Sequence, residues 1–170
     1  KTFFLLLILP LSIIVASSQG TPDQPVIITK ADIEKAGTSI PVQSIGEPVS
    51  SVKLYPPRWI EAAGDTPAYG VVEGSILPVD SNGWPINFRV LLPASWSLRA
   101  VQQGGGGMNG SITVREGRNP MLNRGFVLYG SDSGHQAGGM GAVSYTHLRA
   151  HETVLDLVCR LLLETKKNTT

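Results

Sequence analysis

Four consecutive glycines, residues 104–107 within "LRAVQQGGGGMNGSI", are the first feature of this sequence that could do chemistry. Because glycine has no side chain, the backbone N–H groups of such a run can approach a bound molecule closely. N–H groups held in this way stabilise the oxyanion that forms when a nucleophile attacks an ester carbonyl. We therefore expect an oxyanion loop, with the N–H of Gly106 or Gly107 as the donor, because both precede Met108 and follow a predicted strand.

Two other interpretations use the same glycines. Residues 105–110 match the G-x-G-x-x-G dinucleotide-binding pattern, but "SITVREGRNP" follows and is too rich in β-branched residues, Gly and Pro for the long helix that would bind a pyrophosphate. A flexible glycine linker remains an alternative, because such runs can exist without a function. Strand patterns on both sides of the run favour the oxyanion loop.

The stretch "YGSDSGHQAGG" is a second candidate site. A G-x-S-x-G nucleophile elbow needs Ser at its centre, where this chain has Asp132, and a trypsin-like role for Ser133 needs a histidine upstream, whereas none precedes His135. We expect Asp132 and Ser133 to bond to the local backbone and hold a turn. Asp132 and His135 are assigned only to the border of a site, and no residue of this sequence is assigned as catalytic.

The beginning of the chain is typical of a signal peptide. Residues 1–18 contain one Lys, an apolar run over residues 3–15, and then Ala16 and Ser18 at the spacing for cleavage before Gln19. The apolar run is shorter than the roughly 20 residues that span a bilayer. We expect cleavage and export, to the periplasm or the medium, with no stable membrane insertion afterwards.

The other end of the chain has the pattern of an amphipathic helix but resembles translated adapter DNA. Residues 143–153 and 157–164 are similar to two constant blocks of a sequencing adapter, at the separation that a variable index would give. We therefore treat residues 143–170 as an adapter-derived artefact that truncates the native frame. Because all but one of the Cys and His residues lie there, we predict no metal site and no disulfide.

The segment before residue 66 is predicted to be mostly extended. "TKADIEKAG" indicates a short helix that begins after Thr29 as cap and ends before Gly37. "PVSSVKLY" is typical of a strand, and the prolines around it predict that residues 19–65 form an extended surface wrap.

Residues 66–142 carry the pattern of an α/β fold. Strands are predicted over residues 69–79 and 86–92, joined as an antiparallel hairpin by a turn at Asn82-Gly83. A strand in "LRAVQQ", the glycine loop, a short helix capped by Asn119 and a buried strand over residues 126–129 follow. This order is how an α/β-hydrolase sheet begins, with the oxyanion loop after its third strand.

The segments "TPAYGVVEGSILP", "INFRVLLPASW", "QQGGGGMNGSI" and "RGFVLYGSDSGH" together resemble the amino-terminal part of the tannase and feruloyl esterase family, over residues 66 to about 139. The resemblance implies an α/β-hydrolase core with a large inserted lid, and secreted hydrolysis of small-molecule esters of phenolic acids such as gallate or ferulate. It also implies a Ser-Asp-His triad, with the Ser in a G-C-S-x-G-G elbow beyond the truncation, so that this fragment alone is inactive.

The sequence departs from the family pattern at two places. Gly70 stands where relatives often have Cys, which removes the expectation of a disulfide, and "WSLRAV" replaces a common W-N-G-[RK] pattern. Because of the second departure, the resemblance does not imply that this protein shares the substrate of any particular relative.

Composition narrows the range of partners. The 14 basic and 13 acidic residues nearly balance and form no basic block, so we expect no nucleic-acid partner. No cofactor is expected either. An exported, noncatalytic β-rich binding module that ends near Ala142 remains the competing hypothesis.

The adapter interpretation predicts that the genomic reading frame diverges from this chain near Val143. Long-read sequencing of the source genome checks this, and an uninterrupted gene that encodes "SYTHLRAHET" would refute it.

Overall fold

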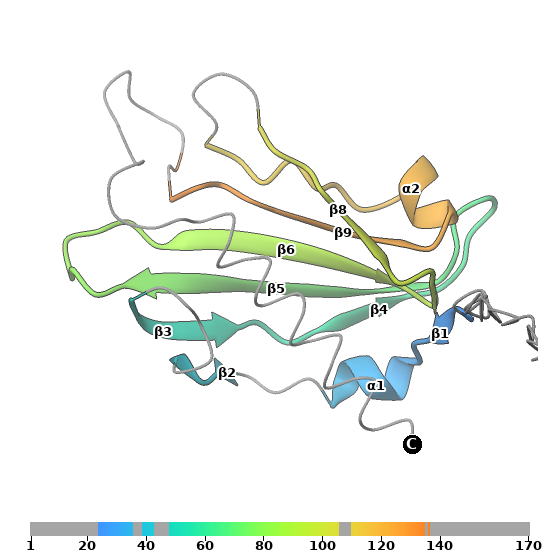
Figure 1. Ribbon diagram of the computed structural model, residues 1–170, viewed down its shortest axis with the longest axis horizontal. Helices are drawn as coiled ribbons and strands as arrows, with labels where there is room; N and C mark the ends of the chain where they lie inside the picture. The colour runs from blue at the N-terminus through green and yellow to red at the C-terminus, as the bar shows by residue number, and fades with distance from the viewer. Residues whose placement is uncertain (1–23, 36–38, 43–47, 106–109, 135, 137–170) are drawn as a thin grey trace, which may run out of the picture.

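The computed structural model describes residues 24–35, 39–42, 48–105, 110–134 and 136 (Figure 1). Most of these residues lie in strands, and only two short helices occur among them. Within the described ranges, no helix is long and apolar enough to cross a membrane. The described part is therefore a mixed sheet with few helices, which is compatible with the start of an α/β fold.

The centre of the sheet is an antiparallel hairpin of β5 (Tyr69–Pro78) and β6 (Ile86–Pro93), which confirms the predicted pair. At its tip the Gly83 N–H donates to the Asp80 carbonyl at 2.9 Å, and the Asn82 N–H donates to Asp80 Oδ1 at 2.9 Å. Asn82 and Gly83 thus form the second half of a four-residue turn that starts at Asp80. The Asp80 carboxylate stabilises this turn because it accepts a hydrogen bond from the backbone N–H two residues further on.

Strands pair on both sides of this hairpin (Figure 1). β3 (Val49–Leu54) and β4 (Arg58–Ile60) pair with successive parts of β5, and β2 (Ser39–Ile40) pairs with β3. On the other side, β9 (Phe126–Ser131) pairs antiparallel with β6, and β8 (Arg99–Gln102) pairs parallel with β9. The order is β2-β3-β5-β6-β9-β8, and β1 (Val26–Ile27) forms a separate pair with β7 (Ser95–Trp96).

The described residues before residue 66 are mostly extended, as predicted, but they do not form a surface wrap. β3 and β4 hydrogen-bond to β5, and Val52 and Leu54 of β3 are buried in the core. The prolines lie between the strands, where a missing N–H costs no ladder bond. The prediction of a wrap failed because prolines outside the strands do not prevent the intervening residues from pairing.

Both helices have the predicted N-terminal caps, whereas Gly37, predicted to follow the end of the first helix, lies outside the described residues. Thr29 and Asp32 form a capping box at the start of α1 (Lys30–Glu34). At α2 (Pro120–Asn123), Asn119 Oδ1 accepts from the Met121 N–H at 2.9 Å, and Gly125 follows with a φ of +76°. Each helix buries one residue, Ile33 and Leu122 respectively, so the caps rather than length define them.

The two faces of the sheet are covered differently. One face carries the larger apolar cluster, and α1 contacts this face at β4 and β5. The cluster comprises Ile28, Ile33, Val49, Val52, Leu54, Val72, Ile76, Ile86, Phe88, Val90, Leu92, Val127 and Tyr129. The other face has a smaller apolar cluster under α2, comprising Tyr69, Val71, Leu91, Val114, Leu122 and Leu128. That second face also carries polar side chains, namely those of Glu73, Ser75, Asn87 and Arg89.

Gly74 of β5 tests the packing of the apolar face. A Cβ at this position would clash with the Lys53 carbonyl oxygen of β3 and lie 2.7 Å from Phe88 Cζ. Gly74→Ala should therefore lower the free energy of unfolding of the full-length protein by about 1–3 kcal/mol. Denaturant unfolding measures this, with Gly104→Ala as control because nothing lies within 4 Å of a Cβ there. Equal stability of the two variants would contradict the packing.

Candidate functional site

The glycine run and the D-S-G turn leave the sheet at the same edge. β8 and β9 are parallel with Gln102 opposite Tyr129, and the Gln103 N–H donates to the Tyr129 carbonyl at 2.8 Å. Both segments therefore follow the carboxyl ends of neighbouring parallel strands, which is where open α/β sheets bind their ligands. The tip of the β5–β6 hairpin lies at this edge too, because β6 starts beside the end of β9 (Figure 1).

The base of the glycine-rich loop is closed by described residues. Thr113 Oγ1 donates to the Gln103 carbonyl at 2.7 Å, which joins the two ends of the loop. A Cβ on Gly130 of β9 would lie 2.6 Å from that carbonyl oxygen and 3.0 Å from Val114 Cγ2. Gly130 thus allows the base of the loop to pack directly on β9.

The donors Gly106 and Gly107 lie outside the described residues, so their assignment stays a prediction. The sequence analysis did not single out Thr113 or Gly130. A signal for Gly130 was present, because a glycine inside a strand pattern often marks a close backbone approach.

Asp132 is buried, with 3% of its surface exposed, and its assignment to the border of a site stays a prediction. Oδ1 accepts from the Asn87 and Gly134 backbone N–H groups, each at 2.9 Å. Oδ2 accepts from Asn87 Nδ2 at 2.7 Å and from Gln136 Nε2 at 2.9 Å. The predicted bond to the local backbone is confirmed by Gly134, while Asn87 of β6 supplies the contacts that were not predicted.

The hydrogen bonds continue from Asp132 across the sheet. Ser75 Oγ donates to Asn87 Oδ1 at 2.7 Å, and the hydroxyl groups of Ser75 and Tyr55 are 2.7 Å apart. Ser75 and Asn87 are direct cross-strand partners in the hairpin. This polar network, Tyr55–Ser75–Asn87–Asp132, fixes the turn after β9 to the central strands.

The turn itself has an uncommon backbone. Ser133 has a φ of +58° and Gly134 a φ of +72°, so two consecutive residues are in the left-handed region. This region is unfavourable for Ser and persists only where the surroundings fix it. The bonds of Asp132 supply that fixation. The neighbouring His135 lies outside the described residues.

No group of three or more His, Cys, Asp or Glu side chains in the described ranges is placed to hold a metal ion. His147, His151 and Cys159 lie outside those ranges.

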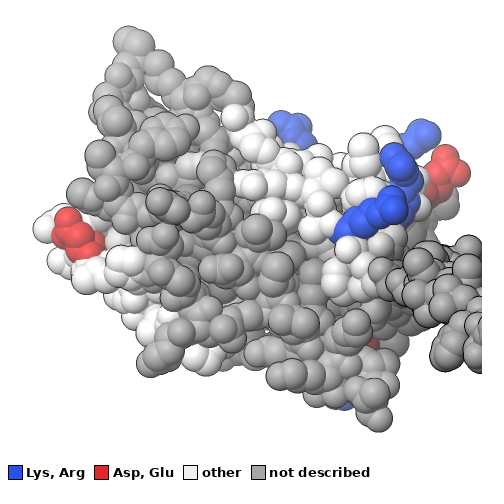
Figure 2. All heavy atoms as spheres, in the orientation of Figure 1, with Lys and Arg blue, Asp and Glu red and all other residues white. Residues whose placement is uncertain are grey.

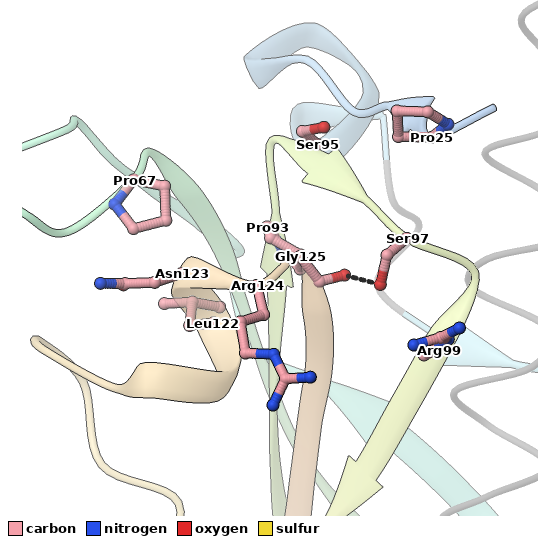
Figure 3. A pocket seen from close by; sticks show the side chains of 10 residues that line it. All are labelled: Pro25, Pro67, Pro93, Ser95, Ser97, Arg99, Leu122, Asn123, Arg124 and Gly125. Atoms are coloured by element: carbon pink, nitrogen blue, oxygen red, sulfur yellow. Dashed lines mark hydrogen bonds between the residues drawn. The ribbon is translucent and has the colours of Figure 1, made fainter.

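A cavity of about 510 Å³ lies at the opposite end of the sheet, near the start of β9 (Figure 3). Its lining includes Arg99 and Arg124, whose guanidinium carbons lie 5.9 and 5.4 Å from the centroid of the Phe126 ring. Basic side chains gather at this end of the molecule in Figure 2. The cavity is separated from the glycine-rich loop by the length of β8 and β9, so we do not assign it to the candidate site.

Comparison with known families identifies the class of protein. The family model described as tannase and feruloyl esterase matches residues 70–168, and the chain belongs to this family. The predicted resemblance is thereby confirmed. The matched range includes residues 143–168, for which the adapter origin stays a prediction.

One curated relative shows how much of such a protein this chain represents. An uncharacterized esterase of Agrobacterium fabrum is 36% identical over 113 residues, which cover 60% of this chain and 20% of that protein. The chain thus spans about a fifth of the relative's length. No solved structure matches the chain.

Asp132→Asn tests the polar network. The new amide places an N–H group against N–H donors that now bond to a carboxylate, so the free energy of unfolding of the full-length protein should fall by about 1–3 kcal/mol. Amide hydrogen exchange at Gly134 should become faster. The matched control is Asp80→Asn, because Asp80 is an exposed turn carboxylate. An equal change in the free energy of unfolding in both variants would show that the buried hydrogen bonds of Asp132 contribute no more to stability than those of the exposed Asp80.

Proposed function

We propose that this chain is the amino-terminal part of a carboxylic ester hydrolase with an α/β-hydrolase core. The observation that carries the proposal is the position of the glycine-rich loop, directly after β8 and at the carboxyl edge of the parallel pair. In α/β-hydrolases the loop after the third strand supplies one oxyanion N–H. In chain order, β8 is the third strand of the main sheet if β5 is counted as the first, because β7 belongs to the other sheet. Family membership and the esterase relative support the same chemistry.

The proposed substrates are esters of phenolic acids of the galloyl or feruloyl type, and the proposed location is outside the cytoplasm. The family description supports the substrate class. The signal-peptide pattern of residues 1–18 supports export.

The proposed role of this chain in the reaction is electrostatic. A serine of a Ser-His-Asp triad, carried by the rest of the longer protein, attacks the ester carbonyl, and the carbonyl oxygen becomes an oxyanion. The N–H of Gly106 or Gly107 donates to that oxygen, and one such donor lowers the barrier by about 3 kcal/mol.

The two polar candidates of the D-S-G turn are not proposed as catalytic groups. Asp132 already accepts four hydrogen bonds from uncharged N–H groups, so its lone pairs are occupied and it is unsuited to act as a base. Ser133 is not at the centre of a G-x-S-x-G nucleophile elbow, because Asp132 takes that position in this chain. Both residues are proposed to shape the edge of the site.

Assays of the full-length protein with methyl gallate and methyl ferulate test the function. We expect hydrolysis of at least one ester, and we expect Ser133→Ala to retain it. Absence of hydrolysis would favour the noncatalytic binding module, and loss of activity in Ser133→Ala would identify that serine as the nucleophile.

The donor assignment has its own test in the active enzyme. Gly107→Pro deletes an N–H and fixes φ, so kcat should fall by about 10² or more if that amide is the donor. Gly104→Ala is the control, because it keeps its N–H and a Cβ there meets no atom within 4 Å. If Gly107→Pro left kcat and KM at the wild-type values, Gly107 would not be the donor.

A further inference from the structure

Four side chains of alternating charge connect three strands to the segment that follows the glycine run. Arg58 of β4 donates to both carboxylate oxygens of Glu116, from Nη1 to Oε2 at 3.1 Å and from Nη2 to Oε1 at 2.6 Å. Arg58 Nη2 also donates to Glu73 Oε2 of β5 at 3.1 Å. Glu73 Oε1 in turn accepts from Arg89 Nε of β6 at 2.7 Å. We call these four residues the charged cluster.

The strand register determines where the charged cluster lies. Glu73 is directly opposite Arg89, and Arg89 is directly opposite Gly130 of β9. The three residues therefore form one row across the second face of the sheet. Because Gly130 has no side chain, the row ends where the base of the glycine-rich loop packs on β9.

The charged cluster binds the segment over residues 113–117, which has no regular secondary structure. Arg89 Nη1 donates to the Val114 carbonyl at 2.9 Å, while Arg58 forms an ion pair with Glu116. At either end of the segment, Thr113 bonds to Gln103, and the Gly117 N–H donates to the Tyr69 hydroxyl at 2.9 Å. A segment without a β-ladder depends on such contacts for a fixed position.

We propose that Glu116 is a positioning residue, which acts through Arg58 to hold the segment after the glycine run in a fixed position on the sheet. Its effect on catalysis rests on the proposed function, since it follows from the need for pre-organised oxyanion donors. A displacement of about 1 Å at such a site can lower the rate by about 10².

The ionisation of Glu116 agrees with this role. The hydrogen bonds from Arg58 lower the pKa of the Glu116 carboxyl below its ordinary value, the charges of Arg58 and Arg89 add to this, and partial burial acts in the opposite direction. The carboxylate is therefore ionised throughout the neutral range. Glu116→Gln removes this charge at nearly constant shape.

The decisive experiment measures hydrogen exchange in the full-length protein, with and without Glu116→Gln. We expect exchange of the amides of residues 113–117 to become at least tenfold faster in the variant, with exchange in the β5–β6 hairpin unchanged. Asp65→Asn is the matched control, because it removes an ion pair to Arg118 at 3.8 Å in which both side chains are more than three-quarters exposed. Unchanged exchange of residues 113–117 in Glu116→Gln would overturn the proposal.

Kinetics of the active enzyme give the second readout. We expect Glu116→Gln to lower kcat by about tenfold or more while KM changes less than about twofold, because the displaced donors act mainly in the transition state. Arg58→Lys keeps the positive charge but cannot form both hydrogen bonds to Glu116, so its kcat should lie between those of the wild type and Glu116→Gln. It replaces Glu116→Gln in this test if that variant does not fold. A wild-type kcat in both variants would refute the positioning role. If the wild-type protein itself hydrolyses no ester, the proposed function is refuted, and hydrogen exchange alone then decides whether Glu116 holds the segment.

Discussion

The parallel pairing of β8 with β9 is the constraint on which the candidate site depends. It places the segments after the two strands at one edge, although 23 residues, 103–125, separate the end of β8 from the start of β9. An antiparallel pairing would have sent them to opposite edges. The close contact of Gln103 with Gly130 then holds the loop against β9.

The central hairpin supports this edge through two sets of polar side chains. Ser75 and Asn87 connect it to the turn after β9, and Glu73 and Arg89 connect it to the segment after the glycine run. All four lie on the second face, toward the tip of the hairpin. The same strands therefore carry an apolar half under α2 and a polar half under the candidate site.

This division has a physical reason. Bonds to a charged group are stronger than neutral ones, and their geometry is more specific, so they can fix irregular segments that bury little apolar surface. The apolar half needs no such bonds, because Leu122 and Val71 are buried there. The cost of burying the polar half is limited by its partial exposure: the side chains of Glu73 and Arg89 are about a quarter exposed.

Local patterns in the sequence determined the elements. Alternation defined β5 and β6, the caps at Thr29 and Asn119 defined the helices, and quoted motifs identified the family. These features depend on residues close together in the chain, so sequence spacing is enough to reveal them.

The tertiary structure alone decided the pairing of β3 and β4 with β5, the burial of Asp132 under Asn87, and the contact of Arg58 with Glu116. The last two join residues 45 and 58 positions apart, and such contacts exist only after the strand register has been set.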